Sequence, residues 1–195
     1  MRRYLAAMAV LAVLGMMGAA YGQEVSASGL VRAGDPVSGN PLGDVTVVVF
    51  SDTECGACRR IYANLDDLVR EDGRVRVVWK DVPVAGARSE LELRALLAAG
   101  RQGGYEAMRD VLVGVGGTVD RDGVRELAER LGLDGGEILR EIDDPAIKAR
   151  IGENEAALRG LGVAGPAVVV GGRVMVGVVG LGALRGAVEE ARRGR

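Results

Sequence analysis

The chain has 195 residues and a formal charge of −2, and it contains two cysteines and no histidine. The absence of imidazole excludes Ser-His-Asp and Cys-His catalysis and His-ligated metal sites, and two thiols are too few for a Cys₄ zinc or iron–sulfur site. A hydrophobic fraction of 48 % beside 27 % charged residues is ordinary for a globular protein. We expect one domain, or one domain with an insertion, that needs no metal and binds no nucleic acid.

The N-terminus has the pattern of a secretory signal peptide. Arg2 and Arg3 precede an apolar run from Leu5 to Ala20, and small residues stand at −3 and −1 of a cleavage site after Gly22. An uncleaved anchor helix is the alternative, but the run is shorter than the roughly 20 residues a spanning helix needs. We therefore predict that residues 1–22 are removed and that the remaining chain is periplasmic or otherwise exported, where disulfides persist.

The first half of the remaining chain predicts a β-α-β unit. Residues 23–44 are rich in Gly, Ser and Pro and are expected to form an irregular lead-in. Val45 to Phe50 has the composition of a buried strand, and an amphipathic helical pattern then ends near Gly73. Val75 to Trp79 reads as a second strand, so the crossover predicts a parallel pair.

The hydrophobic periodicity changes twice in the second half of the chain. The pattern is helical from about Arg88 to Leu161, with four segments at 91–97, 105–112, 124–131 and 145–158. Two short strands around a Gly-Gly turn (166–170 and 173–176) and a closing helix (181–193) follow. The order β-α-β, helical block, β-β-α predicts an α/β thioredoxin-like domain over residues 45–195, with a multi-helix insertion at about 84–161.

The segment Cys55-Gly56-Ala57-Cys58 lies where the first strand passes into the first helix. The spacing puts both sulfurs on one face of a helix start, where the first protrudes and the second faces inward. Cys55 is the predicted attacking thiolate and Cys58 the resolving thiol. The helix N-terminus, with Arg59 and Arg60, favours the thiolate, while Glu54 opposes it.

Other uses of this spacing fit the chain less well. A zinc ribbon needs two more ligands, and haem attachment needs a histidine where Arg59 stands. A purely structural disulfide stays open as an alternative, although so small a loop would constrain the unfolded chain little. The pattern therefore favours a redox-active pair.

Four segments resemble the DsbA-like thiol–disulfide oxidoreductases across nearly all of the chain after residue 22. They are Gly39-Asn-Pro…Gly43-Asp-Val-Thr46, Phe50-Ser-Asp…Cys55-Gly-Ala-Cys-Arg-Arg60, Lys80-Asp-Val-Pro83 and Leu161-Gly-Val…Gly165-Pro-Ala167. The resemblance implies that Cys55 is the nucleophile, that Cys58 resolves, and that a cis-proline loop at Gly165-Pro166 faces them. A strand edge left open there would bind client peptide by strand addition.

Three positions depart from that family's usual pattern. Gly165 directly precedes Pro166, so the proline loop is one residue shorter. The position matching a buried acid in the first strand is Val49, which leaves water, Asp52 or Lys80 to move the proton of Cys58. No histidine lies between the cysteines, so we predict a milder oxidant than relatives that have one, below the roughly −120 mV of DsbA.

The sequence predicts an exported oxidoreductase that exchanges disulfides with client proteins through Cys55 and Cys58, uses no cofactor, and is recycled by a membrane redox partner. The direction of electron flow stays open, because the same residues serve an oxidase and a reductase or isomerase. The rival from another class is a non-catalytic thioredoxin-fold module that binds clients or delivers copper(I) through two thiolates.

Overall fold

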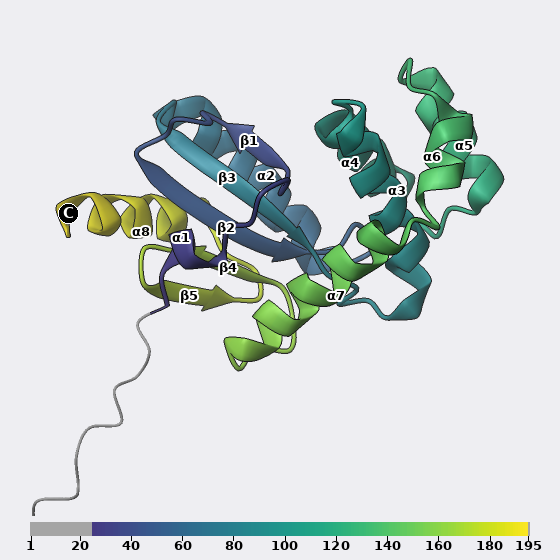
Figure 1. Ribbon diagram of the computed structural model, residues 1–195. Coiled ribbons are helices and arrows are strands. Elements are labelled where there is room, and N and C mark those ends of the chain that lie inside the picture. The colour runs from purple at the N-terminus through teal and green to yellow at the C-terminus, as the bar shows by residue number, and fades with distance from the viewer. Residues whose placement is uncertain (1–24, 195) are drawn as a thin grey trace, which may run out of the picture.

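The computed structural model describes residues 25–194, so the predicted signal peptide lies outside the described residues. The described elements, in chain order, are α1 (Ala27–Leu30), β1 (Val37–Gly39), β2 (Val45–Ser51), α2 (Gly56–Asp72), β3 (Val75–Asp81), the 3₁₀ turn η1 (Ala87–Ser89), α3 (Glu90–Arg101), α4 (Tyr105–Val115), α5 (Arg121–Arg130), α6 (Gly135–Glu141), α7 (Pro145–Gly160), β4 (Ala167–Val170), β5 (Arg173–Val176) and α8 (Leu181–Arg193). Figure 1 shows their arrangement. None of the described helices is long and apolar enough to cross a membrane.

The five strands form one mixed sheet in the order β1-β3-β2-β4-β5. The predicted parallel pair is confirmed, because β2 and β3 run parallel with Val45 opposite Val75 and Ser51 opposite Asp81. β4 pairs antiparallel with β2, and β5 pairs antiparallel with β4. β2 is thus the centre of the sheet, and the turn that follows its C-terminal end leads through Cys55 into the first turn of α2, which holds Cys58.

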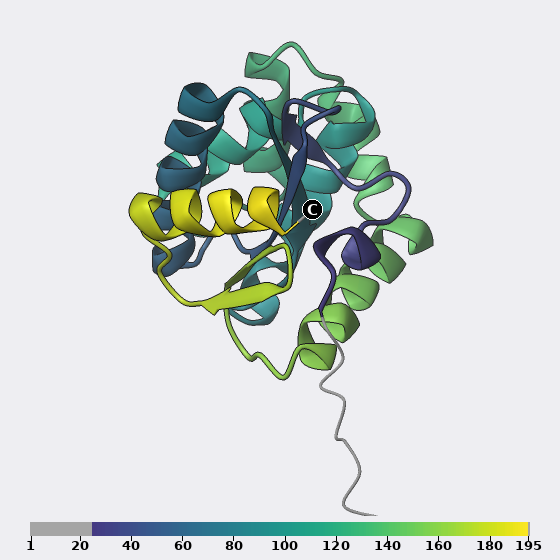
Figure 2. The same cartoon turned by 90° about the vertical axis from the view of Figure 1, so that its left-hand side faces the viewer.

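Helices cover both faces of the sheet. Alternate residues of the central strands separate into two apolar clusters, with Val49 and Trp79 on the α2 face and Val48 and Val78 on the other. α2 and α8 pack on the first face, while α1 and α7 lie together against the second, as Figure 2 shows. Both faces of β2 and β3 are therefore largely buried, which explains why most of their residues are apolar.

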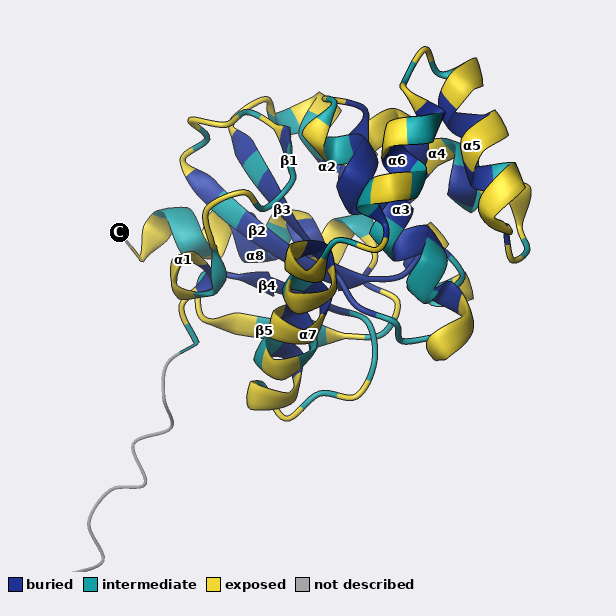
Figure 3. Cartoon of the chain, turned by 45° about the vertical axis from the view of Figure 1, so that its right-hand side comes forward, coloured by how far each residue is buried: buried dark blue, intermediate teal, exposed yellow. Residues whose placement is uncertain are grey.

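The insertion between β3 and β4 is helical, as predicted, and α3 to α6 extend from one end of the sheet (Figure 1). Their inner faces continue the α2-face core through Leu93, Met108 and Ile138, whereas their outer faces are exposed (Figure 3). α6 is missing from the predicted set of four helices. Two glycines at its start, Gly135 and Gly136, weaken its helical pattern, and it is held by Asp134 as N-cap and by burial of Ile138.

The lead-in is more ordered than an irregular segment. α1 lies against β2, and Ala27 N–H donates to the carbonyl of Gly171 at 3.1 Å. β1 adds an antiparallel edge strand in which Val37 pairs with Val78. β1 has only three residues and ends at Gly39 in a left-handed conformation, so a sequence pattern had little length in which to reveal it.

Candidate redox site

Cys55 and Cys58 form a disulfide with Cα atoms 5.2 Å apart. Cys55 is the N-cap of α2, and its sulfur accepts a hydrogen bond from Cys58 N–H at 3.2 Å. Cys55 is partly exposed, whereas Cys58 is fully buried in the apolar cluster beneath the helix. One sulfur is therefore accessible from solvent and the other only through its partner.

The first turn of α2 supplies the electrostatic setting of Cys55. Its backbone N–H groups lack helical partners and carry the positive end of the helix dipole, which stabilises a negative sulfur. Gly56 is exposed, Ala57 half-buried, and Arg59 exposed on the next turn. Glu54, immediately before Cys55, has a carboxyl oxygen that is buried without a hydrogen-bond partner. A negative charge at this position would disfavour the Cys55 thiolate, which stays a prediction from the sequence.

A tight turn leads from β2 into the helix. Cys55 N–H donates to the carbonyl of Asp52 at 3.3 Å. The Asp52 carboxylate is fully buried and accepts hydrogen bonds from Glu54 N–H at 2.9 Å, Ala85 N–H at 2.8 Å and Ser89 Oγ at 2.7 Å. The position of the disulfide is therefore fixed by the turn's contacts with the segment that begins the insertion.

A second buried acid holds the same turn. Thr53 Oγ1 donates to Glu92 Oε2 at 2.8 Å, and Val119 N–H donates to Glu92 Oε1 at 2.9 Å. Glu92 lies on α3 and is fully buried. Sequence reasoning missed it, because a glutamate in an amphipathic helix is normally a surface residue.

The proline loop lies beside the end of β2 that carries the redox turn. Ala167 pairs with Phe50, so Pro166 precedes β4 next to the last residue of β2. The resemblance predicts a cis bond before Pro166, and this expectation is wrong, since no cis peptide bond occurs in residues 25–194. Trans is the lower-energy isomer by about 0.5–1 kcal/mol where nothing constrains the bond. The Pro166 carbonyl accepts from Gly177 N–H at 2.9 Å, so this oxygen is paired within the protein.

The structure places Val49 and one of the residues considered for moving the proton of Cys58. Val49 is fully buried in the same apolar cluster as Cys58. Lys80 does not fit the role, because it lies on the opposite face of β3 and forms a buried ion pair with Asp35. The alternation of side chains along β3 puts Lys80 and Trp79 on different faces, and Trp79 is the one that packs beneath α2.

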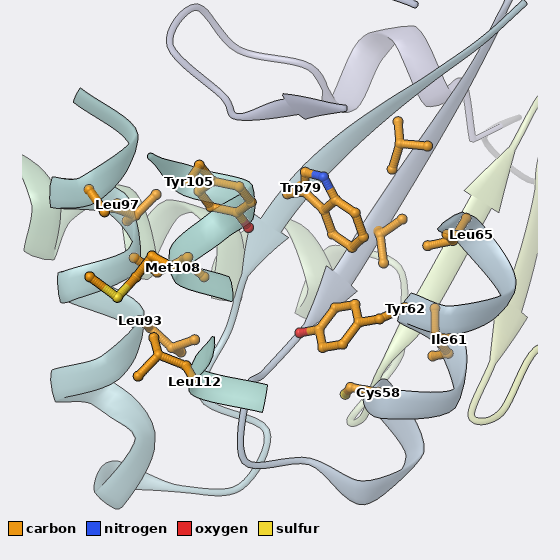
Figure 4. Close-up of a cluster of buried hydrophobic side chains, with 14 of the residues drawn as sticks. Cys58, Ile61, Tyr62, Leu65, Trp79, Leu93, Leu97, Tyr105, Met108 and Leu112 are labelled. Atoms are coloured by element: carbon orange, nitrogen blue, oxygen red, sulfur yellow. The ribbon is translucent and has the colours of Figure 1, made fainter. Parts of the chain in front are cut away.

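A polar and aromatic cluster lies between α2, β3 and α4, and Figure 4 shows its rings facing one another. The Trp79 ring centroid is 5.5 Å from that of Tyr62 and 6.4 Å from that of Tyr105. The Arg109 guanidinium lies over the Tyr62 and Trp79 rings at 5.4 Å and 4.7 Å. This cluster fixes the insertion against the redox helix, and only the core position of Trp79 was apparent from sequence.

Within the described residues, no group of three or more His, Cys, Asp and Glu side chains is arranged to hold a metal ion. The site therefore consists of a partly exposed sulfur at a helix N-terminus, a buried partner sulfur, a neighbouring proline loop and a helical insertion. Together these features define a thioredoxin-fold thiol–disulfide oxidoreductase with an inserted helical subdomain.

Comparison with known proteins is consistent with this class. Residues 46–189 match the model of the DSBA-like thioredoxin domain, and the chain belongs to that family of thiol–disulfide oxidoreductases. A thioredoxin-like oxidoreductase from Silicibacter pomeroyi is similar at 38 % identity and TM-score 0.79, covering 84 % of this chain and 95 % of that one. The thiol-disulfide exchange protein alpha-DsbA2 from Wolbachia pipientis is similar at 27 % identity and TM-score 0.75, covering 82 % and 88 %.

A curated relative is much longer than this chain. A protein of Salinispora arenicola named Na(+)/H(+) antiporter NhaA 1 is 30 % identical over 163 residues, which cover 82 % of this chain and 25 % of that protein. A Salinispora tropica protein named Na(+)/H(+) antiporter NhaA 3 is 29 % identical over 160 residues and is covered to 24 %. The chain spans about a quarter of the length of the curated relatives it matches.

Proposed function

We propose that this protein exchanges disulfides with client proteins in an exported compartment, with Cys55 as the attacking and attacked sulfur and Cys58 as the resolving one. The observation that carries the proposal is the asymmetry of the pair. Cys55 is partly exposed at the N-terminus of α2, and Cys58 is fully buried behind it. A client sulfur can therefore reach only one of the two without unfolding the site.

Oxidation of a client begins when a client thiolate attacks the Cys55 sulfur. The client–Cys55 disulfide forms, the Cys55–Cys58 bond breaks, and the electron pair stays on Cys58, which takes a proton. A second client thiolate then attacks the client sulfur, forms the client disulfide and releases Cys55. Two electrons and the protons of two client thiols have then passed to the cysteine pair or its surroundings.

Reduction runs through the same steps in reverse. The Cys55 thiolate attacks a client disulfide and displaces one client sulfur, which takes a proton. Deprotonated Cys58 then attacks Cys55, closes the internal disulfide and releases the second client thiol. Isomerisation starts in the same way but ends when another client sulfur displaces Cys55. A membrane redox partner would return the pair to its starting state.

The proline loop is the proposed place of client contact. Gly165 is half-buried and Pro166 precedes β4 beside the end of β2. Val176 and Val178, which follow on the neighbouring strand and loop, are exposed large hydrophobic residues. An extended client segment that lies along Gly165-Pro166 would meet these apolar side chains near Cys55.

Activity assays on the chain without residues 1–22 test the proposal. The wild type is expected to catalyse insulin reduction or the recovery of scrambled ribonuclease, and Cys55→Ser is expected to lose that activity. Equal activity of the two proteins would contradict the proposal and favour the rival client-binding or copper-binding module. Thiol trapping in the source cells then reports direction, because an oxidase is held mainly as the disulfide and a reductase or isomerase mainly as the dithiol.

A further inference from the structure

Glu92 is a buried carboxylate that joins the helical insertion to the redox turn. Its side chain is fully buried, and each of its two oxygens accepts one hydrogen bond, from Thr53 Oγ1 at 2.8 Å and from Val119 N–H at 2.9 Å. Both partners are neutral donors. No lysine or arginine among residues 25–194 lies within ion-pair distance of this carboxylate.

The surroundings of Glu92 hold further negative charge. Asp52 and Glu54, on the turn that carries Cys55, both repel the Glu92 carboxylate, and desolvation by burial raises its pKa. Arg59, which follows the cysteine pair, is exposed, and its guanidinium extends toward Gly116. Each oxygen of Glu92 has one neutral donor as its partner, so the ionised carboxylate has both of its oxygens paired.

The Glu92 carboxylate is hydrogen-bonded to the turn that carries Cys55. Thr53, which donates to it, is two residues before Cys55, and the hydrogen bond from Cys55 N–H to the Asp52 carbonyl folds these residues into one tight turn. In a site partly shielded from water, a unit charge attached to this turn acts on the ionisation equilibrium of the thiol that the turn carries.

We propose that Glu92 is a positioning residue of the redox turn, and that its buried negative charge disfavours the Cys55 thiolate and makes the Cys55–Cys58 disulfide less oxidising. Reduction of the disulfide takes up two electrons, together with two protons to yield two thiols or with one proton to yield one thiolate and one thiol. A negative charge beside Cys55 raises the free energy of the thiolate form, so less reduced protein is present at equilibrium. The inference rests on the proposed redox role of the pair.

Glu92→Gln is the informative variant, because it removes the charge and keeps the shape. The amide oxygen can still accept from Val119 N–H, and the Thr53 hydroxyl can turn to accept from the amide nitrogen, so both contacts are kept, one of them with its direction reversed. Glu92→Asp is its counterpart, since it keeps the charge but shortens the side chain. Glu90→Gln is the matched control, an acid on the same helix that is paired with Arg94.

The test measures two properties of the cysteine pair: its equilibrium with glutathione and the ultraviolet absorbance of the Cys55 thiolate as pH is varied. For Glu92→Gln we expect the equilibrium to shift toward reduced protein by about threefold to tenfold, and the thiolate to appear at lower pH. A tenfold change corresponds to about 30 mV. Glu92→Asp and Glu90→Gln are expected to stay within about twofold of the wild type.

The possible outcomes separate the proposed charge effect of Glu92 from the proposed redox function of the cysteine pair. If Glu92→Gln leaves both measurements at wild-type values, or shifts the equilibrium toward the disulfide, the charge effect is refuted. If Glu92→Asp shifts both as far as Glu92→Gln does, side-chain shape and not charge is responsible, and the inference is equally overturned. Failure of the wild-type disulfide to equilibrate with glutathione would instead overturn the proposed function itself.

Discussion

Tyr105 of α4 donates a hydrogen bond of 2.9 Å to Asp81 at the end of β3, inside the protein core. Asp81 is almost fully buried, and its second carboxyl oxygen has no hydrogen-bond partner in the described residues. Desolvation by burial raises the pKa of Asp81 to about 7, and the Asp52 charge adds to this while the bond from Tyr105 opposes it. The insertion is thus attached to the sheet through a carboxyl group that changes charge near neutral pH.

The Asp81 group makes stability depend on pH. In the unfolded chain its pKa is near 3.9, so between pH 4 and 7 the folded state binds more protons, and folding becomes less favourable as pH rises. The free energy of unfolding falls by on the order of 4 kcal/mol between pH 4 and pH 7, because each unit of pKa difference contributes about 1.4 kcal/mol. Asp81→Asn is expected to remove this loss, as measured by urea unfolding of the oxidised protein from pH 4.5 to 8.

Asp122→Asn is the matched control for that measurement, because the Asp122 side chain is 82 % exposed. It should leave the pH profile of unfolding nearly parallel to that of the wild type. An Asp81→Asn profile that also runs parallel to the wild type would show that the buried carboxyl does not titrate in this range.

The positions of the cysteines and the order of elements were predictable because they follow from local patterns. β2 and β3 are rich in β-branched and aromatic residues, α8 (Leu181–Arg193) has a clear amphipathic period, and the two-residue spacing between Cys55 and Cys58 is explicit in the sequence. α2 extends further toward the N-terminus than its apolar positions indicate, because it begins directly after Cys55 as N-cap. These features need no knowledge of distant residues.

What could not be predicted depends on contacts between distant residues. The Thr53–Glu92 and Tyr105–Asp81 hydrogen bonds join residues 39 and 24 positions apart, and no local pattern marks a buried acid. Lys80 was considered for moving the proton of Cys58, but it lies on the other face of β3 from Trp79, because one step along a strand reverses the face. The cis isomer before Pro166 was inferred from the low cost of a cis X-Pro bond and from the resemblance, and neither of these fixes the isomer.

The ion pair between Lys80 and Asp35 tests the assignment of Lys80 to the far face of the sheet. Their side chains are 2 % and 1 % exposed, and Arg150 also pairs with Asp35 at 3.0 Å. Asp35→Ala leaves Lys80 buried without its partner, so we expect a loss of about 3–5 kcal/mol in the free energy of unfolding. Denaturant unfolding near pH 7 measures this.

Two further variants serve as comparisons for Asp35→Ala: the single variant Lys80→Met and the double variant Lys80→Met/Asp35→Leu. The double variant replaces the pair by apolar side chains and is expected to be more stable than Asp35→Ala. Lys80→Met is expected to leave the glutathione equilibrium of the cysteine pair unchanged, because Lys80 and the disulfide lie on opposite sides of the sheet. A marked shift in that equilibrium would restore Lys80 as a candidate for proton transfer.

Replacement of glycine by alanine is expected to have opposite effects on stability at Gly43 and at Gly56. A Cβ added at Gly43 would lie 2.5 Å from the Arg74 carbonyl oxygen and 2.7 Å from Arg76 N, so the backbone would have to move. Gly43→Ala is expected to destabilise the fold by about 1–3 kcal/mol. Gly56, between the cysteines, has nothing within 4 Å of its added Cβ. Gly56→Ala is expected to stabilise by about 0.4–1 kcal/mol in thermal or urea unfolding, and a loss of stability there would contradict the open geometry.

The two cysteines should differ in their ability to hold a client. Cys55 is the partly exposed N-cap of α2, whereas Cys58 is fully buried in the core cluster. Without the resolving thiol, Cys58→Ser is expected to accumulate a mixed disulfide between Cys55 and a client, since attack can occur but internal closure cannot. Cys55→Ser should form about tenfold less complex or none, because a client disulfide cannot reach the remaining sulfur.

Non-reducing gel electrophoresis of proteins trapped in acid measures both complexes. The chain without residues 1–22 is incubated with a client disulfide, and each variant is compared with the Cys55→Ser/Cys58→Ser double variant as the blank. Equal amounts of complex for the two single variants would mean that Cys58 is accessible in solution. The burial of Cys58 would then not prevent its reaction with a client, and the assignment of attack to Cys55 and resolution to Cys58 would be contradicted.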